Sequence, residues 1–221
     1  MADASLTTLQ VRLLELLADV TPRWTLSGGA ALAGFHLRHR STRDLDLFWH
    51  GAREIRRVRD DIALRLLNAG LKANTLVSGA GFSRIEVCDG KETVVLDLVA
   101  DPVPIVDSPV EMTIGSRRIQ VDSAHEILVN KLCTLLSRQE VRDLVDVRQL
   151  ALAGGDLWRA VAQANQKDGG FSPQVLAWLL RGFPLRPLAE KEGASAAEIE
   201  ALEGFRDDFV ADLLRRCKPD D

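Results

Sequence analysis

The sequence lacks the features that mark membrane and secreted proteins. No uncharged apolar run in its 221 residues approaches the roughly 18 to 20 residues that a membrane-spanning helix requires. Its first segment, MADASLTTLQVRLLELL, has no basic leader, and Arg12, Glu15 and Asp19 interrupt the apolar stretch at helical intervals. This pattern is typical of an amphipathic helix and not of a signal peptide. We therefore expect a cytoplasmic protein with no membrane partner.

Cysteine and overall positive charge are also scarce. Cys88, Cys133 and Cys217 lie far apart without metal-ligand spacing, which is typical of reduced, mostly buried thiols. The formal net charge is −4, so a polyanionic partner could bind only at a local basic patch. One candidate patch lies between His36 and Arg59, where there are seven arginines and three acids. It could contact nucleic-acid phosphates, or it could be an ordinary solvated surface.

The chain has neither internal repeats nor low-complexity segments, and a mixed α/β half precedes an all-helical half. Hydrophobic periodicity and turn residues predict helices at about 5–18, 30–37 and 52–68, strands at 24–26, 44–48, 71–77, 83–87 and 93–99, and a hairpin over 111–121. Helices follow at about 124–136, 140–152, 157–164 and 173–180, and a last one begins near Ser195 in a capping box. We expect an α+β core over 1–122 and a helical lobe over 123–221, an order that excludes a doubly wound Rossmann unit.

Two aspartates alternate with leucines in the strand pattern Asp44-Leu45-Asp46-Leu47-Phe48. Side chains at i and i+2 of a strand project from the same face, so the two carboxylates lie side by side and repel each other unless a cation is bound. Asp97 is a third carboxylate in an apolar strand, where an unpaired charge is unfavourable. Magnesium favours such carboxylates, completed by water and substrate phosphates. The three aspartates are therefore candidate metal ligands, although aspartates in this pattern also occur at solvated strand ends.

A glycine pair precedes the aspartates. Gly28 and Gly29 end a predicted strand and open a predicted helix, so bare backbone N–H groups at a helix N-terminus could approach phosphates closely. The same two residues could equally form a tight strand-to-helix turn without any ligand.

Taken together, the stretch SGGAALAGFHLRHRSTRDLDLFW resembles the first motif of the polymerase-β nucleotidyltransferase superfamily. More narrowly, it resembles the AbiEii/AbiGii abortive-infection toxins and the related MenT toxins, in which an arginine and a serine or threonine precede the carboxylate strand. Arg40 and Thr42 occupy those positions here. A later set, Lys131-Leu132, Arg138 and Arg142-Asp143 with Asp146, resembles the helical motif of the same group.

The resemblance implies a polymerase-β-like mixed sheet with flanking helices and an NTP-dependent nucleotidyltransferase that uses Mg²⁺ or Mn²⁺. It implies that Asp44, Asp46 and Asp97 bind the metals, that Asp97 also helps to deprotonate the attacking hydroxyl, and that Gly28, Gly29 and Lys131 contact the triphosphate. Arg40, Thr42 and Arg138 are implied to bind substrate, and Asp143 or Asp146 to orient Lys131, Arg138 or the base.

The acceptor is less defined than the chemistry. The resemblance favours RNA, with the 3′ end of tRNA as the specific acceptor, and a toxin whose cognate antitoxin is a second partner. A small molecule such as an aminoglycoside, or a protein hydroxyl, is the alternative acceptor. A nucleotide-binding module of the same fold without catalysis is a third hypothesis, although three buried or repelling carboxylates are hard to explain without a cation.

Overall fold

The structure is a computed structural model that describes residues 6–217. It divides into two compact units, Met1–Glu126 and Ile127–Asp221, which are called the sheet unit and the helical unit below.

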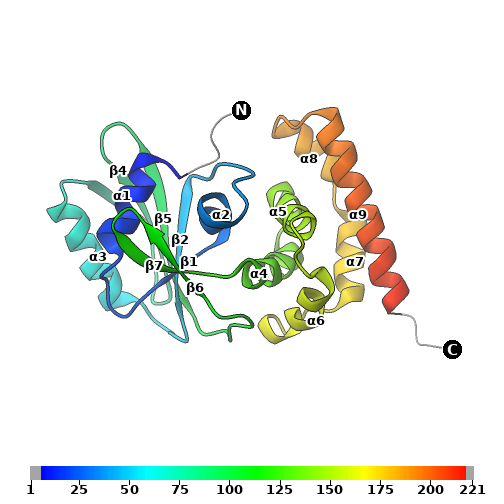
Figure 1. The fold of residues 1–221 in the computed structure, drawn as a ribbon, viewed down its shortest axis with the longest axis horizontal. Coiled ribbons are helices and arrows are strands. Elements are labelled where there is room, and N and C mark those ends of the chain that lie inside the picture. Colours follow the sequence, from blue (N-terminus) through cyan, green and yellow to red (C-terminus); the bar gives the residue numbers. More distant parts are fainter. Residues whose placement is uncertain (1–5, 218–221) are drawn as a thin grey trace. The chain divides into compact units, whose positions relative to one another are not determined.

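The described part of the sheet unit is built on a seven-stranded mixed sheet of order β3-β4-β5-β2-β1-β7-β6 (Figure 1). β2 runs parallel to β5, and β1 runs parallel to β7. The other neighbouring strands are antiparallel. The strands are β1 Thr25–Ser27, β2 Asp44–His50, β3 Lys72–Ser78, β4 Phe82–Cys88, β5 Thr93–Asp101, β6 Val110–Ile114 and β7 Arg117–Val121.

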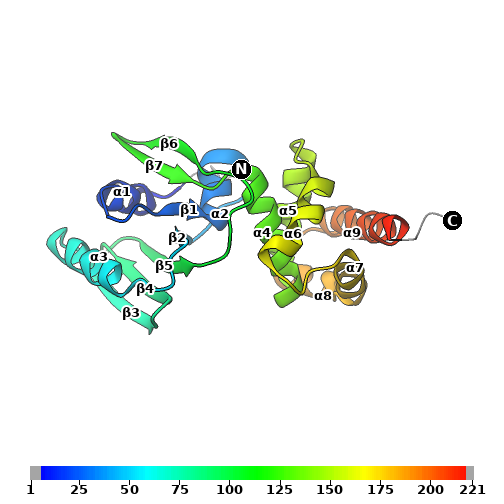
Figure 2. The same cartoon turned by 90° about the horizontal axis from the view of Figure 1, so that it is seen from below.

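Strand β2 shows why the sequence folds as a sheet with one apolar face. Leu45 and Leu47 are fully buried and Trp49 is 2% exposed, whereas the residues between them are half-buried. Helices α1 (Thr8–Leu17) and α3 (Arg56–Asn68) lie on one side of the sheet (Figure 2). Because four leucines of α1 are also fully buried, namely Leu9, Leu13, Leu14 and Leu17, burial of this apolar layer supplies the main driving force for the sheet unit.

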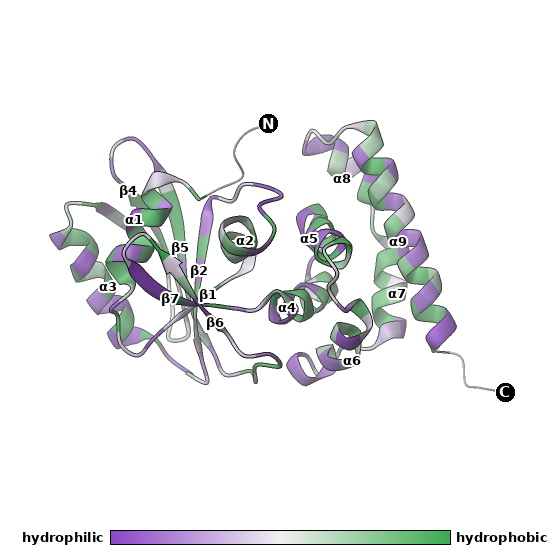
Figure 3. Ribbon diagram, viewed as in Figure 1, coloured by the Kyte–Doolittle hydropathy of each residue, from purple (hydrophilic) through white to green (hydrophobic). Residues whose placement is uncertain are grey.

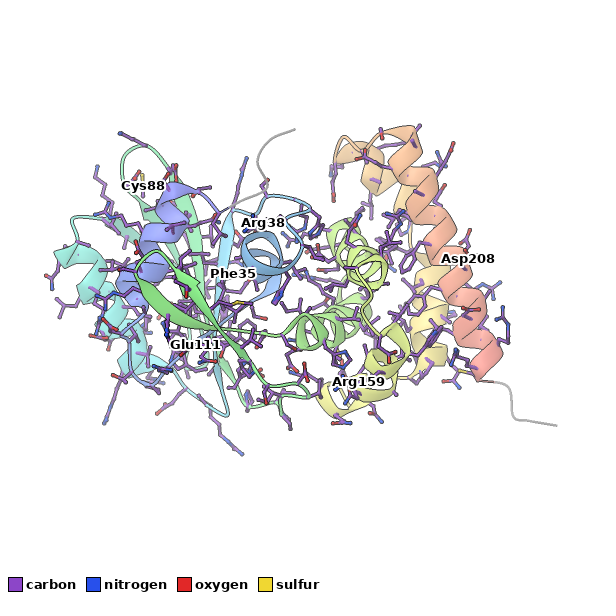
Figure 4. The ribbon with its side chains drawn as sticks, in the orientation of Figure 1. Phe35, Arg38, Cys88, Glu111, Arg159 and Asp208 are labelled. Carbon is purple, nitrogen blue, oxygen red and sulfur yellow. The ribbon has the colours of Figure 1, made fainter. Side chains whose placement is uncertain are left out.

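The segment between β1 and β2 has an irregular helical backbone. Helix α2 (Gly28–Ala31) passes directly into a π-helical turn, η1 (Leu32–His36), in which Leu37 and Arg38 both donate their N–H groups to the carbonyl of Leu32. Arg38 then adopts a positive φ of 51°; its side chain is labelled beside α2 in Figure 4. Single π-helical turns occur frequently at functional sites, and this one lies between the glycine pair and the carboxylate strand.

The helical unit follows the last strand. Its helices are α4 Ala124–Ser137, which begins just before the division between the units, α5 Val141–Leu152, α6 Leu157–Lys167, α7 Pro173–Gly182, α8 Leu185–Lys191 and α9 Ala196–Arg216. The long helix α9 alternates between hydrophobic and hydrophilic residues (Figure 3), and it contacts α5, α7 and α8. Within residues 6–217, no helix is both long and apolar enough to cross a membrane.

The predicted α+β class is confirmed. The three strands predicted after α3 are present and are joined as antiparallel hairpins. Gly70 has a left-handed conformation at the end of α3, and Ser195 and Glu198 form the predicted capping box. Helix α8 was not among the helices predicted from the sequence. Pro184 occupies its N-cap position and Pro187 lies in its first turn, where a backbone N–H is not needed.

The cysteines are free, and they are half-buried instead of mostly buried.

Candidate active site

The three predicted carboxylates lie on one face of the sheet. Asp44 and Asp46 are two residues apart on β2, and the parallel register of β2 and β5 places Asp97 directly beside Asp46. Asp97 is 5% exposed, and the two aspartates of β2 are half-buried. The sheet therefore brings Asp97 next to two negative groups that lie about fifty residues earlier in the chain.

The glycine pair packs against this carboxylate face. β1 ends at Ser27, which pairs with Asp46, and α2 begins at Gly28. Gly28 has a φ of 62°, and a Cβ atom at this position would lie 2.4 Å from Oδ2 of Asp46. Only glycine fits here, both because of the left-handed backbone and because of the close carboxylate.

Arg40 and Thr42 lie on the other glycine. A Cβ atom on Gly29 would be 3.0 Å from Nη2 of Arg40 and 3.2 Å from Oγ1 of Thr42. The Thr42 hydroxyl also accepts a hydrogen bond of 3.3 Å from the backbone N–H of Asp44. Thr42 thus connects the start of the carboxylate strand to the glycine turn, and all four residues of this part of the predicted site are neighbours.

Arg84 is a member of the site that sequence reasoning missed. Its Nε donates to Oδ1 of Asp97 at 2.8 Å, and its Nη2 donates to Oδ2 at 2.6 Å. The hydrogen bond to Asp97 raises the pKa of the Arg84 guanidinium further above its ordinary value, and Asp44 and Asp46 add to this electrostatically. The hairpin contained the necessary signal, because counting outward from the pair Cys88–Thr93 brings Arg84 opposite Asp97.

The carboxylates fit a magnesium site that substrate completes. Among residues 6–217, no group of three or more histidine, cysteine or acidic side chains is arranged as a ready-made metal centre, and both oxygens of Asp97 are bound by Arg84. Magnesium commonly binds through one or two carboxylates together with water and substrate phosphates. The aspartates offer adjacent oxygen ligands, and they lie beside a glycine turn that has no space for a Cβ atom. This arrangement matches a cation that is bound by carboxylates, water and phosphates.

A second ionic group lies further along the same strands. His50 ends β2, with Nδ1 3.0 Å from Oδ2 of Asp101 and Nε2 3.1 Å from Oδ1 of Asp122. Burial opposes protonation of His50, but the hydrogen bonds with the two carboxylates outweigh it and raise the pKa from 6.5 to about 9. Because Asp122 is fully buried, the imidazolium compensates a charge that water cannot reach.

The helical unit contains the later predicted set as a buried ion cluster. Lys131 Nζ is 2.6 Å from Oδ1 of Asp143 and 2.8 Å from Oδ2 of Asp146. Arg138 donates to both oxygens of Asp143, at 2.8 and 3.3 Å. Both aspartates are fully buried and Lys131 is 7% exposed, so the four side chains are positioned by one another. Arg142 contacts Glu140.

A search of curated proteins found no match to the chain. Several solved structures, among them the following two, share its fold. MenT4, a nucleotidyltransferase toxin from Mycobacterium tuberculosis, has 18% identity and a TM-score of 0.61, with 94% of this chain and 84% of that chain covered. JHP933 from Helicobacter pylori has 20% identity and a TM-score of 0.51, with 96% of both chains covered.

These likenesses define the fold as that of a nucleotidyltransferase. The profile of the AbiEii family, described as the nucleotidyl transferase toxin AbiEii of a type IV toxin–antitoxin system, matches residues 12–216. The chain therefore belongs to the AbiEii nucleotidyltransferase toxin family, and it is an enzyme of that class.

Proposed function

We propose that this nucleotidyltransferase moves a nucleotide from an NTP to RNA, with the 3′ end of tRNA as the acceptor. It would act in the cytoplasm as the toxin of a toxin–antitoxin system, with a cognate antitoxin as its partner. The observation that carries the proposal is the placement of Asp46 and Asp97 side by side, against a glycine turn that leaves no room for a Cβ atom.

Asp44, Asp46 and Asp97 are the proposed ligands of Mg²⁺ or Mn²⁺. Bound there, the cation would neutralise triphosphate charge and stabilise the attacking and leaving oxygens in an in-line displacement. Such catalysis depends mostly on positioning and on preorganised charge, and in this proposal the residues of the chain would provide both.

The glycine turn is the proposed triphosphate site. The backbone N–H groups that follow Gly28 and Gly29 would donate to phosphate oxygens, because the first N–H groups of a helix have no partner within it. Arg40 and Thr42, which lie on Gly29, would supply a positive charge and a hydroxyl donor at the same place.

Asp97 is the proposed acceptor of the proton from the attacking hydroxyl. In the helical unit, Lys131 is proposed to contact the triphosphate, and Arg138 is proposed to bind substrate. Asp143 and Asp146 would keep Lys131 in one orientation, since each contacts its ammonium group.

The arginines of residues 36–59 support RNA as the acceptor. Arg53, Arg56 and Arg57 are exposed, so their guanidinium groups are available to phosphates. Binding to a nucleic-acid backbone through such residues weakens steeply as salt concentration rises. A small molecule or a protein hydroxyl does not require an exposed basic surface of this kind.

The test is incubation with each α-³²P-labelled NTP, Mg²⁺ and total RNA, followed by a denaturing gel. We expect labelled RNA from the wild type and a loss of at least about 100-fold with Asp46→Asn, whereas Asp60→Asn, at an exposed aspartate of α3, retains activity. Label on small molecules or on protein would identify one of these, and not RNA, as the acceptor. No labelled product with any NTP and acceptor would contradict the proposal.

The toxin role has a separate test in cells. Induced expression of the wild type should arrest growth and Asp46→Asn should not. Co-expression of the neighbouring gene should restore growth if that gene encodes the antitoxin. Growth that is unaffected by the active enzyme would contradict the toxin role while leaving the chemistry intact.

A further inference from the structure

Arg84 holds the most buried of the three carboxylates through both of its oxygens. The antiparallel register of β4 and β5 places Arg84 opposite Asp97, and the two hydrogen bonds of 2.8 and 2.6 Å form a two-point contact. A guanidinium matches a carboxylate in this geometry better than any other side chain does. Asp97 is therefore occupied in the structure by a cation that belongs to the protein.

The electrostatics extend beyond this pair. Asp44 and Asp46 also act on the Arg84 guanidinium, so one positive charge partly compensates three negative ones. A divalent cation at the same carboxylates would find the oxygens of Asp97 already bound by Arg84. It would also be repelled by the positive charge of the guanidinium. A charge within about 4 to 6 Å of an ionisable group shifts its proton-binding equilibrium by roughly 10-fold or more, and a bound metal cation is subject to the same repulsion.

The two partners differ in their freedom to move. The Asp97 side chain is 7% exposed, whereas the Arg84 side chain is 44% exposed. Arg84 also lies over the ring of Phe82, 5.9 Å from its centroid, two residues away on the same strand face. Arginine can therefore leave Asp97 towards solvent while remaining against an aromatic ring, but Asp97 cannot follow it.

We propose that Arg84 is a positioning residue that occupies Asp97 when the carboxylates hold no divalent cation, and that loading of the cation displaces it. Arg84 thus lowers the affinity of the sheet unit for a metal ion that arrives without a nucleotide. A metal ion that arrives with an NTP binds Asp97 fully, because the phosphates of the NTP attract the released guanidinium. The inference rests on the proposed metal role of the three aspartates.

The test measures Mn²⁺ binding to the nucleotide-free chain by the loss of the free-ion EPR signal. We expect Arg84→Gln to bind Mn²⁺ about 10-fold more tightly than wild type, and Arg84→Lys, which keeps the charge but loses the two-point contact, to lie between them. Arg118→Gln is the matched control, because it removes an exposed arginine from another strand of the same unit and should leave the affinity unchanged.

A second readout is the rise in melting temperature on addition of Mn²⁺. Arg84→Gln leaves Asp97 buried without its cation, so the ion should stabilise this variant more than it stabilises wild type. An affinity of Arg84→Gln equal to or weaker than wild type would overturn the inference, since Arg84 would then be a permanent support of Asp97. If Arg84→Gln does not fold, the same criterion applies to Arg84→Lys.

Failure of the proposed metal site gives a different pattern. Asp46→Asn and Asp97→Asn should each weaken Mn²⁺ binding. If neither does, the carboxylates are not the metal ligands. If both do while Arg84→Gln gains no affinity, only the role of Arg84 is wrong.

Discussion

His50 makes the stability of the sheet unit depend on pH in a direction that can be calculated. The imidazolium lies between Asp101 and Asp122, and its pKa is raised from 6.5 to about 9. At about 1.4 kcal/mol per unit, this shift corresponds to roughly 3 kcal/mol of folding free energy. A raised pKa means that the native state binds the proton more tightly than the unfolded state does, so the contribution is fully present below about pH 6.5 and is lost as pH rises through about 9.

The perturbation is His50→Gln, which keeps a hydrogen-bond donor but removes the titrating charge. The variant should be less stable than wild type by roughly 3 kcal/mol near pH 6, because Asp122 is then buried without a cation. Near pH 9.5 the wild-type imidazole is mostly neutral as well, so most of the difference should disappear.

The assay is urea unfolding followed by tryptophan fluorescence from about pH 6 to about pH 9.5. The buried Trp24 and Trp49 report on the sheet unit, and a background with Trp158→Phe and Trp178→Phe removes the signal of the helical unit. A constant difference between wild type and His50→Gln over this range would refute the reasoning. So would an NMR titration of the His50 ring with a midpoint near 6.5.

Three further predictions concern the candidate site and the helical cluster. Asp46→Asn should abolish labelling of RNA without changing the far-UV circular dichroism spectrum; retained activity would exclude a metal role for that carboxylate. Gly28→Ala should lower activity by about 100-fold or more because its Cβ would displace Asp46. The control is Gly51→Ala, at a glycine that also has a positive φ but open space around it, and this variant should only lose stability. Equal activities of the two variants would argue against the close approach of Gly28 to Asp46. Lys131→Met should destabilise the helical unit by about 3 to 5 kcal/mol in urea unfolding, because the buried Asp143 and Asp146 both lose the ammonium group that contacts them. A loss below about 1 kcal/mol would contradict this.

Trp158 and Trp178 illustrate a limit of pattern reasoning. Both occupy apolar helical patterns, which predict packing in a core. Trp158 does pack, against Phe209 with ring centroids 5.8 Å apart, but Trp178 is 73% exposed. Periodicity identifies the apolar side of a helix, whereas the neighbours that cover that side are contributed by distant parts of the chain.

The sequence by itself determined the local features of this protein. The alternation around Asp44 and Asp46, the glycine turn and the capping box at Ser195 were readable because each depends on residues a few positions apart. The family resemblance added Lys131 and its acidic partners as a group, although not their burial.

Only the tertiary structure decided which charges compensate one another. Arg84 holds Asp97 because a hairpin register places it there, and His50 lies between Asp101 and Asp122 because the ends of β2 and β5 meet the residue that follows β7. The contacts of His50 join parts of the chain that are distant in sequence, whereas Arg84 and Asp97 lie on consecutive strands of a hairpin. The strength of both sets of contacts depends on burial. The register of a hairpin can be counted from its turn, but burial and the pairing of distant strands cannot be read from a short segment. The partners of His50 therefore became visible only in the assembled sheet.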